Sequence, residues 1–207
     1  AISADEFCEN MDPKMWAEAK ARYRVVKRRA ENQSKKLSFS LGGGGAVELL
    51  YFLAWKIKPK VILETGVGAG HSSLAFLTAI EDNGHGVLFS SDLPYFRLEN
   101  PDQYVGFVVP KKLRKNWRVY LHGDSVNISK IIPEIENIDL FHYDSDKSLT
   151  GRKNVLEMLK GKIDKATIVI DDIQDNDHFY DLVMSNLFEE KSVFVIREKN
   201  KYVGILI

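Results

Sequence analysis

The order of apolar and polar positions predicts alternating strands and helices over most of the chain. Short apolar runs, typical of strands buried on both faces, are separated by longer amphipathic stretches. The predicted strands cover residues 61–63, 87–91, 117–121, 138–143, 166–170, 193–197 and 202–206. The predicted helices before and between them cover residues 46–56, 70–80, 149–160 and 178–188. We therefore expect an α/β fold with a doubly wound, mostly parallel, seven-stranded sheet, in which the C-terminal hairpin supplies one antiparallel strand.

The beginning of the chain has a different pattern. Residues 4–36 are rich in Ala, Glu, Lys and Arg and carry apolar residues at helical spacing, which predicts one or two amphipathic helices. Asp12 followed by Pro13 is typical of a helix N-cap and first helical residue. Residues 41–45 contain four consecutive glycines and are predicted to form a flexible joint. The expected division is an N-terminal helical segment, residues 1–44, and a main domain, residues 45–207.

Composition and charge narrow the class of protein. The 207 residues, 44% of them hydrophobic, are enough to bury the core of one globular domain. Lys plus Arg and Asp plus Glu both number 29, so the net charge is zero, which argues against a nucleic-acid partner. A single cysteine, Cys8, allows no internal disulfide. No signal peptide or membrane-length apolar run is recognisable, so we expect a cytoplasmic protein without a membrane partner.

A glycine-rich segment, residues 64–70 (Glu-Thr-Gly-Val-Gly-Ala-Gly), follows the first strand of the main domain and opens a helix. Glycines permit a tight turn and close approach of a ligand, and a helix N-terminus offers free N–H groups to an anion. The alternative is an ordinary glycine-rich turn. A dinucleotide-binding loop would normally have the spacing G-x-G-x-x-G, which is absent here. The residues expected to contact the ligand are Glu64, Thr65, Gly66, Gly68, Gly70, His71, Ser72 and Ser73.

Acidic residues follow the next three predicted strands. Asp92 ends the second strand, Asp124 and Ser125 follow the third, and Asp144 ends the fourth. A single acid in such a position is more often a helix cap or a loop residue. With Glu64, however, four acids stand at four successive strand ends, where doubly wound sheets bind their ligands. We therefore include Asp92, Asp124, Ser125 and Asp144 in the predicted ligand site.

Two further acids, Asp171 and Asp172, end the fifth predicted strand. In a parallel sheet this end is expected to lie beside Asp144. Three converging carboxylates repel one another unless a cation is present, and oxygen ligands suit Mg²⁺. The sequence therefore predicts a metal site formed by Asp144, Asp171 and Asp172. The alternative for the Asp171–Asp172 pair is a helix cap next to a solvated acid.

Two residues are candidates for moving a proton at this site. Lys147 follows Asp144 by three residues and is the first candidate for a general base. Its alternative role is that of a surface lysine paired with Asp146. His178, six residues after Asp172, is the other candidate. Such a histidine is more often a helix residue without a catalytic role. The predicted catalytic residues are thus Asp144, Lys147 and His178.

The glycine spacing, with an acid at the strand end, resembles the first motif of class I S-adenosylmethionine-dependent methyltransferases. This resemblance implies a Rossmann-like fold and S-adenosylmethionine as cofactor. It also implies that Asp92 accepts hydrogen bonds from the ribose hydroxyls. The adenine ring would then lie near Asp124 and Ser125.

Over residues 45–207 the sequence resembles metal-dependent O-methyltransferases. In the catechol type, Asp144 and Asp171 match two magnesium ligands and Lys147 matches the catalytic lysine, but an asparagine stands where this chain has Asp172. The Asp171–Asp172 pair is more similar to the macrolide and aminocoumarin sugar O-methyltransferases, which carry a histidine in place of Lys147. The resemblance therefore leaves the acceptor class open.

The expected function is methylation of a small hydroxylated molecule, with S-adenosylmethionine and Mg²⁺ as the implied cofactors. The alternatives are an NAD-dependent oxidoreductase and a non-catalytic binding module of the same fold. Two segments are expected to cover the acceptor. Residues 93–115 do not alternate and predict a long excursion over the strand ends. Residues 1–44 either cover the acceptor site or form the contacts of a homodimer.

Overall fold

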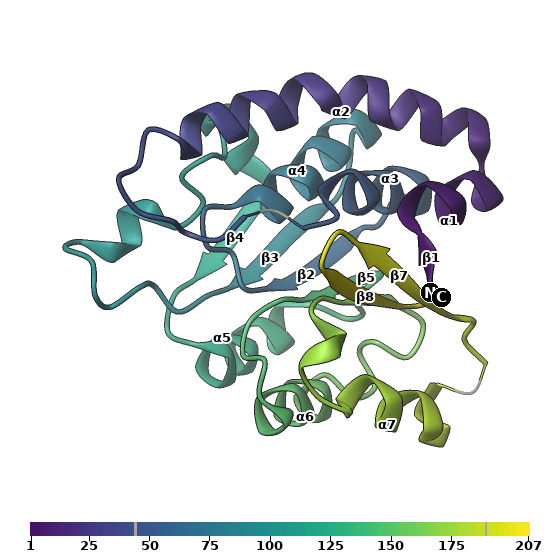
Figure 1. The fold of residues 1–207 in the computed structure, drawn as a ribbon. Helices are drawn as coiled ribbons and strands as arrows, with labels where there is room; N and C mark the ends of the chain where they lie inside the picture. Colours follow the sequence, from purple (N-terminus) through teal and green to yellow (C-terminus); the bar gives the residue numbers. More distant parts are fainter. Residues whose placement is uncertain (44, 189) are drawn as a thin grey trace.

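The computed structural model describes residues 1–43, 45–188 and 190–207, which form one sheet of eight strands flanked by helices (Figure 1). The strands are β1 (Ile2–Ser3), β2 (Val61–Thr65), β3 (Val87–Ser91), β4 (Trp117–Tyr120), β5 (Leu140–Tyr143), β6 (Thr167–Ile170), β7 (Val193–Glu198) and β8 (Lys201–Leu206). Their order across the sheet is β1-β7-β8-β6-β5-β2-β3-β4. Strand β8 is antiparallel to both neighbours, whereas the other pairs are parallel. The predicted doubly wound, mostly parallel sheet with one antiparallel strand is confirmed.

The sheet has one strand more than the seven predicted. The additional strand, β1, is only two residues long and pairs in parallel with β7, so that Ile2 lies opposite Ile196. Two residues are too few to show the alternating pattern that identifies a strand in a sequence. The strand ends where Ser3 becomes the N-cap of the first helix and accepts a hydrogen bond from the amide of Glu6.

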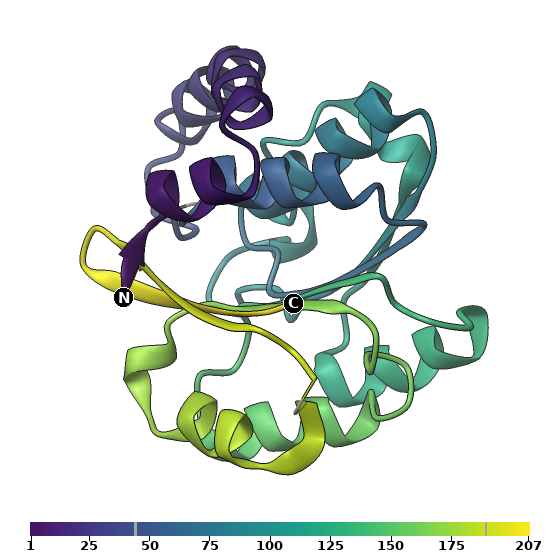
Figure 2. The same cartoon turned by 90° about the vertical axis from the view of Figure 1, so that its right-hand side faces the viewer.

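The helices cover the two faces of the sheet (Figure 2). One face carries α1 (Ala4–Met11), α2 (Pro13–Ser34), α3 (Val47–Ile57) and α4 (His71–Asn83). The other carries α5 (Asp124–Ile131), α6 (Leu149–Met158) and α7 (His178–Met184). Short 3₁₀ turns are η1 (Pro101–Tyr104), η2 (Lys111–Asn116), η3 (Ile132–Glu134), η4 (Ile173–Asp175) and η5 (Asn186–Phe188). Within the described residues, no helix combines the length and apolar character needed to cross a membrane.

The sheet separates two apolar cores, because successive side chains of a strand face opposite sides. Ile62 and Leu140 belong to the core under α1–α4, whereas Leu63 and Phe141 belong to the core over α5–α7. All four side chains are fully buried. Near the carboxyl ends of the same strands the apolar side chains give way to polar ones, and this change places the candidate site at that edge of the sheet.

The N-terminal helices are part of the first core. Asp12 caps α2 through a 2.9 Å hydrogen bond from the amide of Met15, as predicted from the Asp–Pro pair. On the inner face of α2, Trp16 packs edge-on against Phe52, with ring centroids 5.4 Å apart. Whether residues 1–44 cover the acceptor or form a dimer contact stays a prediction.

The last helix is shorter than predicted, because α7 ends at Met184, Ser185 is extended, and the 3₁₀ turn η5 follows. Of the predicted joint at residues 41–45, Gly44 lies outside the described residues, and the flexibility of the joint stays a prediction.

The packing of Trp16 provides a test of the N-terminal segment. Its side chain is 3% exposed and its Nε1 donates to Asp5, so Trp16→Ala should lower the free energy of unfolding by about 3–5 kcal/mol. Val25→Ala, on the exposed face of the same helix, should change it by no more than about 0.5 kcal/mol. Urea denaturation followed by circular dichroism measures both. An unchanged main transition in Trp16→Ala would mean that α2 unfolds separately from the sheet.

Candidate active site

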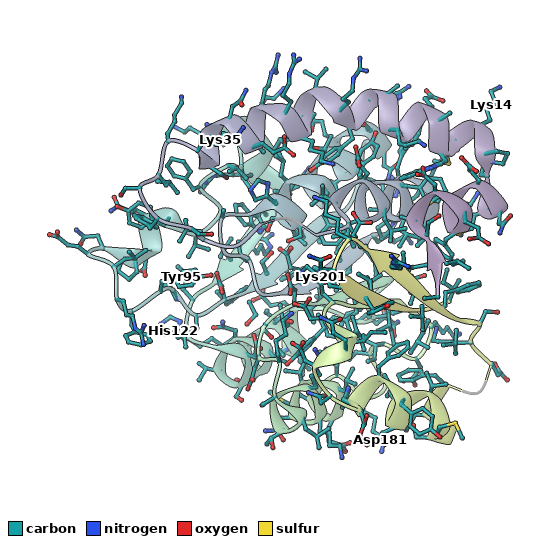
Figure 3. All side chains as sticks on the ribbon, viewed as in Figure 1. Lys14, Lys35, Tyr95, His122, Asp181 and Lys201 are labelled. Carbon is teal, nitrogen blue, oxygen red and sulfur yellow. The ribbon has the colours of Figure 1, made fainter. Side chains whose placement is uncertain are left out.

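A cavity of about 870 Å³ lies at the carboxyl ends of the central parallel strands. Pockets for small molecules commonly have this size. Its wall includes the glycine loop after β2, the acids that follow β3, β4, β5 and β6, and residues of the N-terminal segment. Lys201, at the start of β8, also lines it and lies near the centre of the molecule in Figure 3.

The glycine loop is shaped by close contacts with the protein's own backbone. Gly66 has a φ of +82°, and a Cβ atom built there would overlap the carbonyl of Asp144. Gly68 has a φ of +52°, and its Cβ would lie 2.7 Å from the carbonyl oxygen of Leu41. Both positions therefore require glycine. The sequence predicted close approach of a ligand to these glycines, whereas the close approach seen in the structure is by neighbouring segments of this chain.

Glu64 lies behind the wall of the cavity. Its carboxylate is fully buried and accepts hydrogen bonds from Ser73 at 2.6 Å and Ser90 at 2.8 Å. Burial raises the pKa of Glu64 to about 7, although the serine hydroxyls act in the opposite direction. The structure thus corrects the prediction of a direct ligand contact, because the side chain points into the layer between the sheet and α4. Thr65, Gly70 and Ser73 likewise do not line the cavity.

The remaining predicted ligand residues do reach the wall of the cavity: Gly66, Gly68, His71, Ser72, Asp92, Asp124, Ser125 and Asp144. His71 is tied to the N-terminal segment, since its Nε2 lies 2.9 Å from the hydroxyl of Ser34. Burial lowers the pKa of His71, which favours the neutral ring. This contact brings the end of α2 to the edge of the site.

Asp92 connects the second strand end to the glycine loop. One carboxylate oxygen accepts from the amide of Gly68 at 3.1 Å and the other from the amide of Leu93 at 2.9 Å. Burial raises the pKa of Asp92, and the amide hydrogen bonds partly offset this effect. Because each carboxylate oxygen has two lone pairs, Asp92 keeps the capacity to accept further hydrogen bonds from a ligand in the cavity.

Asp124 is held by two hydroxyl groups. Ser91 donates to it at 2.6 Å and Ser145 at 2.5 Å. The buried side chain of Asn127 donates to Ser91 as well as to two backbone carbonyls at the ends of β3 and β4. Sequence reasoning missed Ser91, Asn127 and Ser145, since isolated polar residues next to a motif carry no pattern of their own.

The three acids predicted to bind a metal converge. Asp144, Asp171 and Asp172 each place one oxygen within 4.8 Å of the other two. Asp172 has a φ of +52°, which is uncommon outside glycine, and the buried guanidinium of Arg152 donates to the carbonyls of Asp171 and Asp172. Arg152 therefore holds the turn that carries both carboxylates.

Two lysines neutralise part of this acidic cluster. Lys147 is hydrogen-bonded to Asp144 and lies 3.3 Å from Asp172, rather than pairing with Asp146. Lys201 lies 2.9 Å from Asp171 and 3.2 Å from Asp172. Sequence reasoning did not identify Lys201, because it appeared only as a residue of the predicted hairpin turn.

The lysines act against the effect of burial on the acids. Burial and the neighbouring Asp171 raise the pKa of Asp144 to about 7, while Lys147 opposes this shift. Burial alone would also raise the pKa of Asp172, but Lys147 and Lys201 hold it below its usual value. Likewise, burial would lower the pKa of Lys201, but the carboxylates of Asp171 and Asp172 raise it.

His178 and His142 line different cavities. His178 lines a different cavity, of about 530 Å³, between α6 and α7, so the expectation that it reaches the acidic cluster is not met. Asp181 of the same helix is well separated from Lys201 in Figure 3. His142, which sequence reasoning missed, instead lines the strand-end cavity beside Glu64, with 3.9 Å between His142 Nδ1 and Glu64 Oε1. Burial lowers the pKa of His142 to about 4.

Comparisons with known proteins identify the family of this chain. A sequence model of the family described as "Methyltransferase domain" matches residues 63–173, more than half of the chain. The match includes the glycine loop and all three clustered acids, and it favours a methyltransferase over an NAD-dependent oxidoreductase. A search of curated protein sequences finds no match.

Solved structures share the fold. A SAH-bound methyltransferase of Podospora anserina, PaMTH1, has a TM-score of 0.65 and 13% identity, with 96% of this chain and 95% of that chain covered. The SAM-bound O-methyltransferase TomG of Streptomyces achromogenes, involved in tomaymycin synthesis, has a TM-score of 0.58 and 16% identity over 93% and 87% of the two chains. A Bacillus cereus O-methyltransferase in complex with SAH gives 0.57 and 13%, over 89% and 90%. The family match shows that the chain belongs to the methyltransferase-domain family, and the solved structures show that it shares the fold of methyltransferases that bind S-adenosylmethionine or S-adenosylhomocysteine.

Proposed function

We propose that the protein transfers a methyl group from S-adenosylmethionine to a hydroxyl of a small acceptor, with assistance from a divalent cation such as Mg²⁺. The observation that carries this proposal is the convergence of Asp144, Asp171 and Asp172 beside the glycine loop of a methyltransferase fold. The solved O-methyltransferases of similar fold support transfer to oxygen. A small-molecule acceptor, a cytoplasmic location and a role of residues 1–44 as acceptor cover or dimer contact belong to the same proposal.

The residues around the glycine loop fit the cofactor. Asp92 lines the cavity and has acceptor capacity left for the ribose hydroxyls. Asp124 and Ser125, at the N-terminal end of α5, are assigned to the adenine end of the cofactor. When bound, S-adenosylmethionine supplies the methyl group that is transferred.

The acidic cluster fits a divalent cation. Its three oxygens come from three carboxylates, the ligand type that Mg²⁺ prefers. Asp171 is 3% exposed, and its Oδ1 atom is buried without a hydrogen-bond partner among the described residues. Such an atom is costly unless a ligand occupies it. A bound Mg²⁺ would supply a Lewis acid that lowers the pKa of an acceptor hydroxyl.

Two further residues, one paired with the acids and one at the cavity wall, complete the proposal. Lys147, which reaches Asp144 and Asp172, is the proposed general base for the acceptor hydroxyl. Tyr95 lines the cavity on the excursion after β3 and offers an aromatic face to an acceptor ring. In Figure 3 Tyr95 is well separated from Asp181, a residue of α7.

Removing the charge of Asp92 should weaken cofactor binding. Asp92→Asn is expected to raise the dissociation constant of S-adenosylhomocysteine by about 10–100-fold, because hydrogen bonds to a charged group are lost. Isothermal titration calorimetry measures the effect, and Asp102→Asn, an exposed acid on η1, is the matched control. Equal affinity of Asp92→Asn and the wild type would contradict the cofactor assignment.

The metal assignment has an acceptor-independent test. Asp171→Asn should weaken Mg²⁺ binding by at least about 10–100-fold, since a charged ligand is lost, while S-adenosylhomocysteine affinity stays within a few-fold of the wild type. The exposed Asp175→Asn serves as control. If the wild type gives no Mg²⁺ binding at all in the titration, the metal part of the proposal fails and the methyltransferase assignment stands.

The choice of general base is tested by a pair of substitutions. Lys147→Met should lower the rate of methyl transfer by about 10²–10⁴-fold, the usual contribution of a positioned base. His178→Ala should leave that rate nearly unchanged, because His178 lines another cavity. Transfer of labelled methyl from S-adenosylmethionine to a panel of catechols and hydroxylated sugars is the measurement. The reverse outcome would assign the base to His178.

A further inference from the structure

The topology of the sheet brings Lys201 to the acidic cluster. Strand β8 is antiparallel to β6, with Ile170 opposite Gly204, so the first residue of β8 lies at the edge where β6 ends. The amino end of β8 thus supplies a lysine to a site that the parallel strands line with acids. In Figure 3 Lys201 stands where the terminal hairpin meets the centre of the molecule.

The ammonium group of Lys201 lies between the two neighbouring acids. Its Nζ is 2.9 Å from Asp171 Oδ2 and 3.2 Å from Asp172 Oδ1. Lys147 bridges Asp144 and Asp172 in the same way. Positive and negative groups therefore alternate through the cluster. With all five groups ionised, three carboxylates and two ammonium groups would leave one net negative charge.

The position of Lys201 is fixed from the opposite side as well. A Cβ built on Gly45 would lie 3.2 Å from Lys201 Cε and 3.5 Å from Asp171 Oδ2. The segment before α3 thus packs directly on the lysine and its partner. This packing leaves the side chain about one-third exposed, at 32%, and limits the directions in which it can move away.

We propose that Lys201 is a built-in counter-ion that a divalent cation must displace in order to use both Asp171 and Asp172 as ligands. This inference rests on the proposed metal-assisted function and concerns the control of that same site. A cation that binds both carboxylates would stand within a few ångströms of the ammonium group, and like charges at that separation repel strongly in a partly buried site. Asp171 Oδ1, buried and without a partner among the described residues, is the oxygen that the lysine leaves available.

Two consequences follow for the metal-free protein. Lys201 relieves the repulsion between Asp171 and Asp172, so the acidic cluster stays assembled without a metal. The same ammonium group lowers the affinity for a metal, so that occupancy depends on the concentration of the free cation. A lysine at this place therefore sets the threshold at which the metal site fills.

The test uses Mn²⁺ as a probe, with the full chain stripped of metal by EDTA. Lys201→Met should bind Mn²⁺ at least about tenfold more tightly than the wild type, measured by calorimetry and by the electron paramagnetic resonance signal of free Mn²⁺. Lys201→Arg keeps the charge and should behave like the wild type. Lys115→Met removes a lysine from an exposed ion pair with Glu81 and is the matched control. S-adenosylhomocysteine binding verifies that each variant is folded.

The outcomes separate this inference from the proposed function. Unchanged or weaker Mn²⁺ binding by Lys201→Met, with clear binding by the wild type, would overturn the inference alone. Weaker binding would mean that Lys201 orders the carboxylates for the metal, and unchanged binding that it does not compete with the metal. No Mn²⁺ binding by any of the proteins would overturn both the metal site and the inference.

A second measurement needs no variant. Mn²⁺ should increase the rate at which Lys201 of the wild type is acetylated by a water-soluble reagent, followed by mass spectrometry with Lys115 as internal reference. Protection of Lys201 by Mn²⁺, or no change at saturation, would contradict its displacement.

Discussion

The contact between Gly66 and the backbone of Asp144 sets the arrangement of the whole site. Strands β2 and β5 pair in parallel up to Thr65 and Tyr143, and the amide of Asp144 donates to the carbonyl of Thr65 at 2.9 Å. The two chains therefore leave the sheet at the same level, and a side chain at position 66 would overlap the carbonyl of Asp144. Because only hydrogen fits there, the glycine loop and the acidic cluster share one wall. The proposed donor and acceptor sites become neighbours as a direct result.

The second constraint is that buried carboxylates need hydrogen-bond donors or positive charge nearby. The site provides these in two ways. Hydroxyls and backbone amides hold Glu64, Asp92 and Asp124, so these acids are stabilised by neutral donors. Ammonium groups hold Asp171 and Asp172 instead. Neutral donors offset only part of the effect of burial on the pKa of Glu64 and Asp92, whereas the carboxylates of Asp171 and Asp172 are paired with positive charge. The acids that lie within a few ångströms of one another are at the ends of β5 and β6, where the acceptor hydroxyl is proposed to bind.

Much of the site could be predicted from the sequence because it depends on short-range patterns. A strand followed by glycines fixes Gly66 and Gly68, and parallel neighbours bring the ends of successive strands together, which is enough to place Asp144 beside Asp171. The direction of single side chains was not accessible in this way. Glu64 lies one residue from the end of β2 and turns away from the cavity, and His178 begins a helix that faces another layer.

Contacts between distant segments were also beyond the sequence pattern. Lys201 reaches the cluster only because β8 is inserted antiparallel beside β6, and nothing in the hairpin itself indicates which strand it will join. His142 is similar: its place in an apolar run predicts burial, but its position beside Glu64 depends on the register of β5 against β2, which pairs these two residues.

Some residues that line the cavity lie outside the range matched by the family model. The match covers residues 63–173 and so contains the glycine loop and the acids. The cavity wall also includes Leu41, whose carbonyl accepts from the amide of Ala69 at 3.3 Å, and Lys201, which packs beneath Gly45. These contacts join the N-terminal segment and the last hairpin to the two halves of the site. The glycine loop and the clustered acids therefore lie in the matched range, whereas the proposed acceptor pocket and the proposed control of cation affinity also involve residues outside it.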